Sequence, residues 1–197
     1  YYPATKAQAE QVVLQANNES FKTVALRPHL IFGPGDQNLV PTVLERADIG
    51  KLIQIGDGKN LSDFTYIDDC ISAHICALET LQDPERSQKA AGKAYFISQA
   101  EPWPLWKWVN TLLALTGRPP ISKKISFWQA RLIAFLLENI HRLICPKVEP
   151  RLTCFLVEEM ATSHYFDITA ARQLLGYEPK LSMQAALEVT AAAFKRK

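Results

Sequence analysis

The first hundred residues contain segments whose apolar positions have helical spacing and, between them, short apolar runs typical of strands. From Ala4 to Gln15 the apolar positions recur at helical spacing, which predicts a helix entered through Pro3. Short runs rich in β-branched and aromatic residues predict strands between further helical segments. The predicted elements are a helix over 4–15, a strand over 21–26, a helix over 40–47, strands over 52–55 and 64–67, a helix over 68–81 capped by Asp68, and a strand over 93–98. This alternation predicts an α/β fold with a mainly parallel sheet.

Helical periodicity dominates the second half of the chain. A helix is predicted over 105–116, and the chain is expected to be mostly helical from Phe127 onward. In the stretch 125–145 the longest uninterrupted apolar run, 132–137, has six residues, whereas a membrane-spanning helix needs about 20. We therefore expect an amphipathic helix that packs on its own domain; a lid over an apolar substrate and a contact with a membrane surface are the alternatives.

Composition and charge exclude several classes of protein. With 48% hydrophobic and 21% charged residues, the chain has too much apolar content to be disordered. Its net charge of +2 gives no reason to expect a nucleic-acid partner. The four cysteines and four histidines form no metal-ligand spacing, so we expect no metal site and reduced thiols in a cytoplasmic protein. The first residues contain neither an initiator methionine nor a signal peptide, and we expect the chain to belong to a longer protein.

Tyr2 and Lys6 are four residues apart in the first predicted helix, so their side chains share one face. A phenol has a reference pKa of about 10, and a nearby ammonium group favours its ionised form. Lowering that pKa by about 3 units requires about 4 kcal/mol, which a desolvated lysine and a cationic nicotinamide ring supply together. Such a tyrosine exchanges a proton with an alcohol or ketone while hydride moves to or from a cofactor. Alone the pair is a weak signal, because a helix-start tyrosine followed by a solvated lysine has the same spacing.

Longer motifs in a fixed order strengthen this interpretation. They are YYPATKAQAE at 1–10, ALRPHLIFGPGD at 25–36, DFTYIDDCISAH at 63–74, GKAYFISQAEP at 92–102 and SHYFDITAARQLLGYEP at 163–179. As a set they resemble the extended short-chain dehydrogenase/reductase family, in its 3β-hydroxysteroid dehydrogenase/isomerase branch. The resemblance covers nearly all 197 residues.

The resemblance assigns roles to individual residues. It implies that Tyr2 is the catalytic acid/base, and that Lys6 lowers the pKa of Tyr2 and binds the nicotinamide ribose. It places the backbone of Pro28 and His29 beside the nicotinamide, with a positioning or packing role for the His29 ring. It implies a substrate-pocket border that includes Phe32, Gly33 and Asp36.

The fold implied by the resemblance is the C-terminal part of a Rossmann-type extended dehydrogenase fold plus a mostly helical substrate-binding region. Residues 1–100 are expected to form the C-terminal part of the Rossmann domain with interleaved substrate-binding segments, and residues 101–197 the helical region. Dinucleotide binding needs a strand, a glycine-rich turn and a helix N-terminus. Neither Gly33-Pro34-Gly35 nor Gly56-Asp57-Gly58 has a third glycine at the right offset. We therefore expect NAD or NADP to be bound mainly by a half of the protein outside this sequence.

The expected function is that of an NAD(P)-dependent oxidoreductase that interconverts an alcohol and a ketone on a bulky apolar substrate. The branch implies two substrate classes, sterols and 2-alkyl-3-oxoalkanoates, and the C-terminal motifs look closer to the second. A nucleotide-sugar epimerase or dehydratase of the same superfamily and a non-catalytic binding or scaffold protein remain alternatives. We expect the isolated chain to be inactive and the full-length protein to be a cytoplasmic homodimer, with a peripheral membrane contact as a further expectation.

Overall fold

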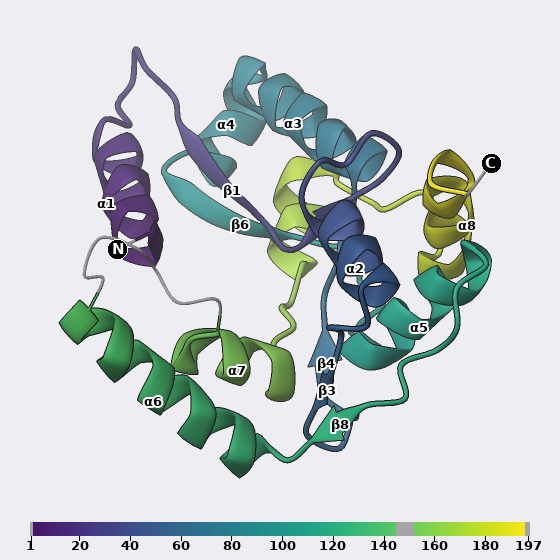
Figure 1. Cartoon of the computed structure of the whole chain (residues 1–197). Coiled ribbons are helices and arrows are strands. Elements are labelled where there is room, and N and C mark those ends of the chain that lie inside the picture. Colours follow the sequence, from purple (N-terminus) through teal and green to yellow (C-terminus); the bar gives the residue numbers. More distant parts are fainter. Residues whose placement is uncertain (1, 145–151, 196–197) are drawn as a thin grey trace. The chain divides into compact units, whose positions relative to one another are not determined.

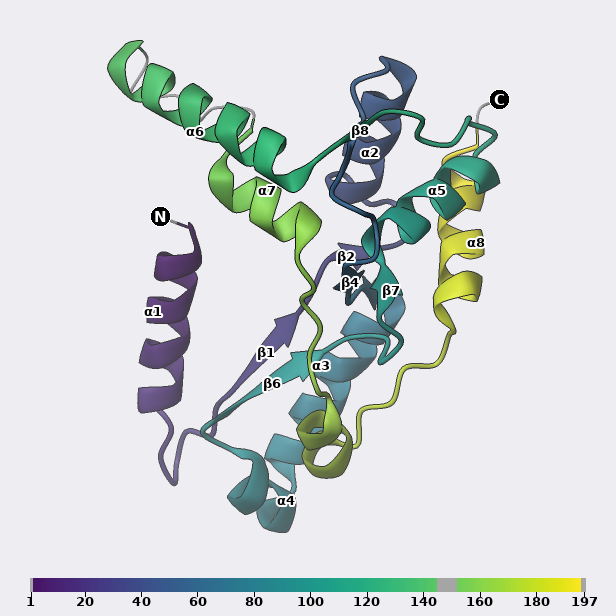
Figure 2. The same ribbon diagram turned by 90° about the horizontal axis from the view of Figure 1, so that it is seen from below.

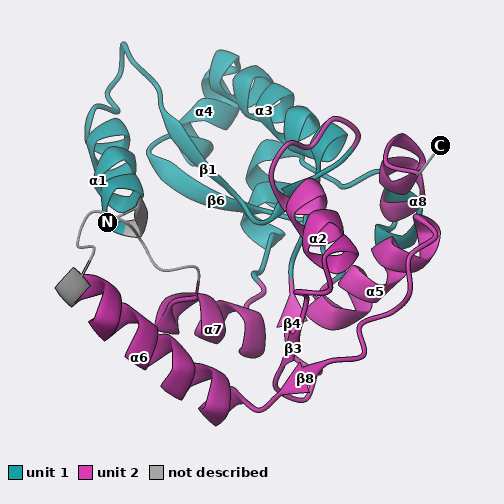
Figure 3. Cartoon of the chain, in the orientation of Figure 1, with its two compact units in different colours: residues 1–33, 63–101, 166–186 teal, residues 34–62, 102–165, 187–197 magenta. Residues whose placement is uncertain are grey.

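The structure, a computed structural model, describes residues 2–144 and 152–195, with the side chains at positions 2, 3, 143 and 144 outside that description (Figure 1). These residues form two compact units, each built from three separate stretches of chain (Figure 3). Unit 1 comprises residues 1–33, 63–101 and 166–186, and unit 2 comprises residues 34–62, 102–165 and 187–197. The division of the protein into domains 1–100 and 101–197 stays a prediction.

Unit 1 is built on two parallel strand pairs. Strand β1 (Val24–Pro28) pairs with β6 (Lys93–Ile97), and β2 (Ile31–Phe32) pairs with β5 (Thr65–Tyr66). Helices α1 (Tyr2–Gln15) and α3 (Ile67–Gln82) lie on opposite sides of the β1–β6 pair in both views (Figures 1 and 2). The remaining elements of this unit are helix α4 (Pro84–Ala90), the π-helical turn η1 (Ala171–Leu175) and the start of α8 (Met183–Ala193).

The interior of unit 1 combines small residues with buried polar side chains. Ala73 and Ala77 of α3 pack in one core cluster with Tyr95 and Ile97 of β6. The absence of large side chains on this face of α3 lets the helix approach the sheet closely. Asp69, which is 1% exposed, accepts hydrogen bonds from Gln99 Nε2 at 2.6 Å and from the Lys180 N–H at 2.9 Å. A buried carboxylate thus connects α3 to two segments that are distant in sequence.

Unit 2 has short strands and longer helices. Strand β3 (Gln54–Ile55) pairs in parallel with β8 (Lys124–Ile125), and β4 (Leu61–Ser62) pairs antiparallel with β7 (Trp103–Pro104). Its helices are α2 (Leu39–Asp48), α5 (Leu105–Leu115), α6 (Phe127–Ile144), α7 (Cys154–Ala161) and the end of α8. Helices α6 and α7 lie side by side (Figure 2). One core cluster of this unit consists of Ile55, Trp106, Ala130, Ala134 and Val157.

The structure confirms the α/β class and most predicted elements. Helices α1, α2 and α5 and strand β6 each lie within one or two residues of their predicted bounds. The amphipathic helix predicted over 125–145 is α6, and α6, α7 and α8 make the chain mostly helical from residue 127, as predicted. No described helix has both the length and the apolar character that crossing a membrane requires.

Two predictions about the ends of elements are wrong. Strand β1 begins at Val24 rather than at Phe21, because Asn18 Oδ1 accepts the N–H groups of Ser20 and Phe21 in a turn. Helix α3 begins at Ile67, so its N-cap is Tyr66 and not Asp68. Asp68 lies in the first turn, where a carboxylate is favourable next to the positive end of the helix dipole.

Candidate active site

Helix α1, which carries the predicted catalytic pair, is fastened to β1 by side-chain hydrogen bonds. Arg27 Nε donates to Glu10 Oε2 at 2.7 Å, and this hydrogen bond lowers the pKa of the Glu10 carboxyl. Near the end of the helix, Thr23 Oγ1 donates to the carbonyl of Val13 at 3.0 Å and the Thr23 N–H donates to Asn17 Oδ1 at 2.9 Å. These bonds fix the rotation of α1 against the strand.

Positions 2, 6 and 10 are spaced by four residues and therefore share one face of α1. Because Glu10 on this face binds Arg27, the face is turned toward β1. Tyr2 belongs to α1, but its side chain lies outside the described residues; Lys6 is described and exposed. The two predicted catalytic positions thus lie one turn apart on α1, and the contact with β1 that the structure shows on this face is that of Glu10.

The end of β1 is held by Thr65. Pro28 is the last residue of the strand and pairs with Ile97, the last residue of β6. The fully buried Thr65 hydroxyl lies 2.8 Å from the His29 carbonyl and 3.0 Å from the Ile97 carbonyl, and it accepts the His29 N–H at 3.2 Å. Two parallel strands therefore end together, and ligands of open α/β sheets bind beyond the carboxyl ends of such strands.

The His29 ring is held by a hydrogen bond and by aromatic packing. Its Nδ1 lies 2.8 Å from the carbonyl of Asp63, which requires the N–H tautomer at this nitrogen. The ring also makes an edge contact with Phe166, at 5.4 Å between centroids, and Phe166 stacks on Phe96 at 4.1 Å. The Arg27 guanidinium in turn lies over the Phe96 ring, 5.0 Å from its centroid. The His29 ring therefore packs between β1 and the segment at Phe166, while its role beside a nicotinamide stays a prediction.

Phe32 and Gly33 are buried in unit 1. Phe32 is 1% exposed and contacts the rings of Phe64 and Tyr66 edge-on, so its side chain packs in an aromatic cluster. A Cβ atom at Gly33 would lie 2.4 Å from Ile67 Cγ2, so close packing on α3 requires glycine here. Burial raises the pKa of the Tyr66 phenol, with Asp68 as a smaller cause, so this tyrosine stays protonated at neutral pH.

Asp36 belongs to unit 2 and shapes the start of α2. Its Oδ1 accepts the N–H groups of Asn38 at 2.7 Å and Leu39 at 3.2 Å, and its Oδ2 accepts that of Val40 at 2.8 Å. These are N–H groups that the helix itself leaves without carbonyl partners. The carboxylate therefore determines the path of the chain from residue 36 into α2.

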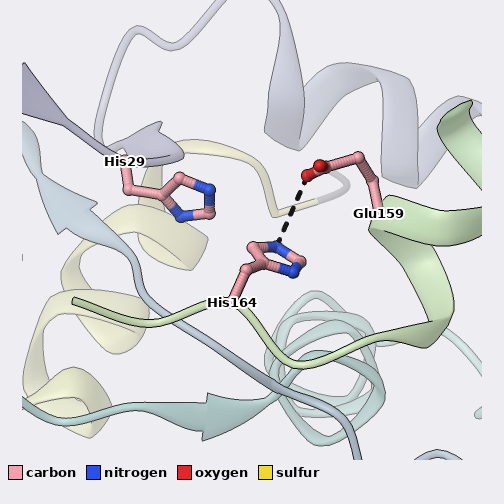
Figure 4. Close-up of side chains that lie close together, drawn as sticks. All are labelled: His29, Glu159 and His164. Carbon is pink, nitrogen blue, oxygen red and sulfur yellow. Dashed lines mark ion pairs between the residues drawn. The ribbon is translucent and has the colours of Figure 1, made fainter.

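Unit 2 also contains a serine–histidine pair that the sequence did not reveal. Ser62 Oγ lies 3.0 Å from His164 Nε2, whereas His164 Nδ1 lies 3.1 Å from the carbonyl of Thr162. Glu159 approaches the same Nε2 at 3.7 Å, as the dashed line in Figure 4 shows. A hydrolytic triad needs the carboxylate on the opposite ring nitrogen and an accessible serine, whereas Ser62 is fully buried. The pair therefore joins β4 to the segment after α7 and does not form a nucleophilic site.

The described residues of each unit, taken separately, bring together no three side chains that could hold a metal ion. Cys70, Cys76 and Cys154 are free thiols, and Cys145 lies outside the described residues. For a dinucleotide cofactor, the candidates from the sequence are Lys6, Pro28 and His29, and their contacts with such a molecule stay a prediction. No glycine-rich turn for a pyrophosphate occurs in this sequence.

Comparisons with solved structures define the class of fold. The protein gox2253 has a TM-score of 0.70 at 22% identity, with 98% of this chain and 55% of that chain covered. UDP-glucose 4-epimerase from Thermotoga maritima has a TM-score of 0.64 at 21% identity, covering 98% and 52%. The fold is therefore that of the Rossmann-type extended short-chain dehydrogenases, as predicted.

Comparisons with characterised sequences define the family. Residues 1–126 match the 3-beta hydroxysteroid dehydrogenase/isomerase family, and the chain belongs to it. The chain is 48% identical to a 2-alkyl-3-oxoalkanoate reductase of Stenotrophomonas maltophilia, over 94% of this chain and 56% of the relative. It is 38% identical to the decarboxylating sterol-4-alpha-carboxylate 3-dehydrogenase of Mus musculus, over 98% and 54%. The chain spans about half the length of these curated relatives.

Proposed function

We propose that the full-length protein containing this chain is an NAD(P)-dependent reductase of 2-alkyl-3-oxoalkanoates. The observation that carries the proposal is the attachment of α1 to β1, because Glu10, which shares a helix face with positions 2 and 6, binds Arg27 in the strand that ends at Pro28. The 48% identity to a reductase of that name favours this substrate class over sterols. The similarity to the sterol-4-alpha-carboxylate 3-dehydrogenase of Mus musculus keeps a sterol carboxylate as the second substrate class.

The chemistry follows from the residue types. When bound, the nicotinamide supplies or accepts the hydride. During reduction the Tyr2 phenol donates a proton to the ketone oxygen as the alcohol forms, and during oxidation it takes that proton back. The Lys6 ammonium would favour the phenolate and hold the ribose, and the backbone at Pro28 and His29 would contact the nicotinamide. A pyrophosphate would need a glycine-rich turn, which this sequence does not contain.

Replacing Tyr2 tests the catalytic assignment. Tyr2→Phe in the full-length protein should lower kcat by about 10²–10⁴-fold, because the ring remains and only the transferable proton is lost. Its affinity for NAD(P)H, measured by fluorescence titration, should stay unchanged, whereas Lys6→Met should weaken both turnover and cofactor binding. Tyr1→Phe is the matched control and should behave like the parent. Near-normal turnover of Tyr2→Phe would contradict the assignment.

Substrate comparison tests the class of reaction. Purified full-length protein should reduce a long-chain 2-alkyl-3-oxoalkanoate with a higher kcat/KM than it shows for sterol carboxylates or UDP-sugars, since apolar binding surface cannot stabilise a sugar nucleotide. Preference for a sterol carboxylate would move the protein to the other substrate class of its family. Preference for a UDP-sugar would favour the epimerase alternative.

We infer a cytoplasmic homodimer with a peripheral membrane contact through α6. Trp128 and Phe135 on this helix are 72% and 55% exposed, which supports a contact with an apolar environment. Vesicle co-sedimentation of the full-length protein tests this contact. The double variant Trp128→Asp and Phe135→Asp should abolish sedimentation with vesicles while the oligomeric state, measured by light scattering, stays unchanged. Equal sedimentation of parent and variant would exclude α6 as the contact.

A further inference from the structure

Unit 2 contains a cavity of about 590 Å³ that the catalytic assignment does not use. Helix α2 and the segment after it form one wall, strands β3 and β8 form the floor, and α6 and α7 contribute further walls. This volume lies within the range of about 300–1,000 Å³ typical of sites for small molecules. The cavity therefore has the size of a ligand site inside a single unit of the protein.

The lining of the cavity is mainly aliphatic. Ile55 and Ala130 belong to the buried core of unit 2, so the floor of the cavity is continuous with that core. Ile49 and Ile53, from the segment after α2, and Ile133 of α6 line it and remain 54%, 40% and 43% exposed. Three large aliphatic side chains from two separate segments thus present apolar surface to one space. An apolar ligand in this space gains free energy by removing that surface from water.

Polar lining side chains are confined to one wall. Thr42, Glu45 and Arg46 come from one face of α2, and Lys51 follows shortly after that helix. Among the described residues, the floor and the walls from α6 and α7 offer no charged side chain to the cavity. A sugar nucleotide needs polar partners around most of its surface, whereas a flexible hydrocarbon chain needs none.

We propose that this cavity is the subsite for one alkyl chain of the substrate and sets the chain length that the enzyme prefers. The inference rests on the proposed function, because it takes the substrate to be a 2-alkyl-3-oxoalkanoate. The path of the chain supports it: the family resemblance places Asp36 at the border of the substrate pocket, and Asp36 binds the first N–H groups of α2, the helix that forms one cavity wall. The substrate loop and the cavity wall are therefore consecutive and joined by hydrogen bonds.

A chain-length series measures the subsite. In the full-length protein, kcat/KM for 2-alkyl-3-oxoalkanoates should rise about fourfold with each added methylene until the cavity is filled, and should then level off. Ile133→Trp shortens the cavity. It should lower kcat/KM for long-chain substrates about tenfold, equivalent to the loss of about two buried methylenes, and leave short-chain substrates unaffected. Leu132→Trp is the matched control, because Leu132 is the next residue of α6, is 60% exposed and does not line the cavity.

The outcomes separate the subsite from the proposed function. Equal effects of Ile133→Trp and Leu132→Trp, or no effect of either, would overturn the subsite while reduction of the substrate continues. Ile133→Trp could lose activity on substrates of every chain length. In that case Ile133→Ala tests the subsite, because the enlarged cavity should shift the preferred substrate toward longer chains. An unchanged preference in Ile133→Ala would overturn the subsite. Absence of activity with all chain lengths in the parent protein would instead refute the proposed function.

Discussion

The interiors of the two units are stabilised in different ways. In unit 1 a buried carboxylate and a buried hydroxyl, those of Asp69 and Thr65, hold strand ends and distant segments at hydrogen-bonding distance. In unit 2 the core around Trp106 is mainly apolar, and beside it lies the aliphatic cavity. Hydrogen bonds are directional, whereas apolar contacts tolerate changes of shape. Unit 1 therefore holds distant segments by directional bonds, whereas the subsite proposed for unit 2 would tolerate apolar ligands of different length.

The largest effect on stability is expected from removing the centre of the unit 2 core. Trp106→Ala should lower the free energy of unfolding by about 4 kcal/mol, because a large side chain that is 2% exposed leaves a cavity behind. Trp128→Ala, at a site 72% exposed, should change it by less than about 0.5 kcal/mol. Urea unfolding of the full-length protein followed by circular dichroism measures both. Equal effects of the two variants would contradict the apolar core described for unit 2.

A smaller effect is expected from the buried carboxylate of unit 1. Asp69→Ala should destabilise the protein by about 3 kcal/mol, because Gln99 Nε2 and the Lys180 N–H lose their acceptor inside the protein. The neighbouring Asp68→Ala should stay within about 0.5 kcal/mol, since Asp68 is exposed. The same unfolding experiment applies. A loss below about 1 kcal/mol for Asp69→Ala would show that the hydrogen bonds accepted by Asp69 do not stabilise unit 1.

Two bidentate arginine–carboxylate pairs provide a third comparison between the units. Arg118 of unit 2 binds Asp48 at 2.8 and 3.0 Å with its side chain 8% exposed, whereas Arg172 of unit 1 binds Glu178 with its side chain 42% exposed. Arg118→Lys should cost about 1.5 kcal/mol, because the planar fork is lost where water cannot replace it. Arg172→Lys should cost no more than about 0.5 kcal/mol. Thermal unfolding of both variants should show a larger loss of stability for Arg118→Lys than for Arg172→Lys. A larger loss for Arg172→Lys would contradict the argument from burial.

The smallest effect is a pH dependence at the attachment of α1. The hydrogen bond from Arg27 lowers the pKa of Glu10 in the folded protein, so its stabilisation is present above the ordinary carboxyl pKa and is lost as the pH falls through the lowered value. Glu10→Gln should therefore be less stable than the parent by about 0.5 kcal/mol at pH 7, a difference that should shrink as the pH falls below the ordinary carboxyl pKa and vanish below the lowered one. Unfolding curves at several pH values measure it. A difference that does not change with pH would exclude an ionic contribution.

Local signals in the sequence determined most elements and part of the site. Helical spacing determined α1, α2 and α5, and the four-residue interval between positions 2 and 6 required no tertiary information. Helix α4 was missed although Asp83 and Pro84 carry its start signal, with Asp83 accepting the N–H groups of Glu85 and Arg86. Helices of seven residues have too little periodicity to be recognised from apolar spacing alone.

Contacts between residues distant in sequence could be found only in the tertiary structure. Thr65 lies 36 residues from His29 and Ser62 lies 102 residues from His164, and no spacing rule relates such positions. The same holds for the cavity, whose exposed isoleucines come from segments that are adjacent only after folding. The sequence by itself determined the helices, the α/β class and the catalytic candidates, because these depend on residues within a few positions of one another. The tertiary structure alone decided how the strand ends are held and where the aliphatic cavity lies, because burial depends on which distant segments meet.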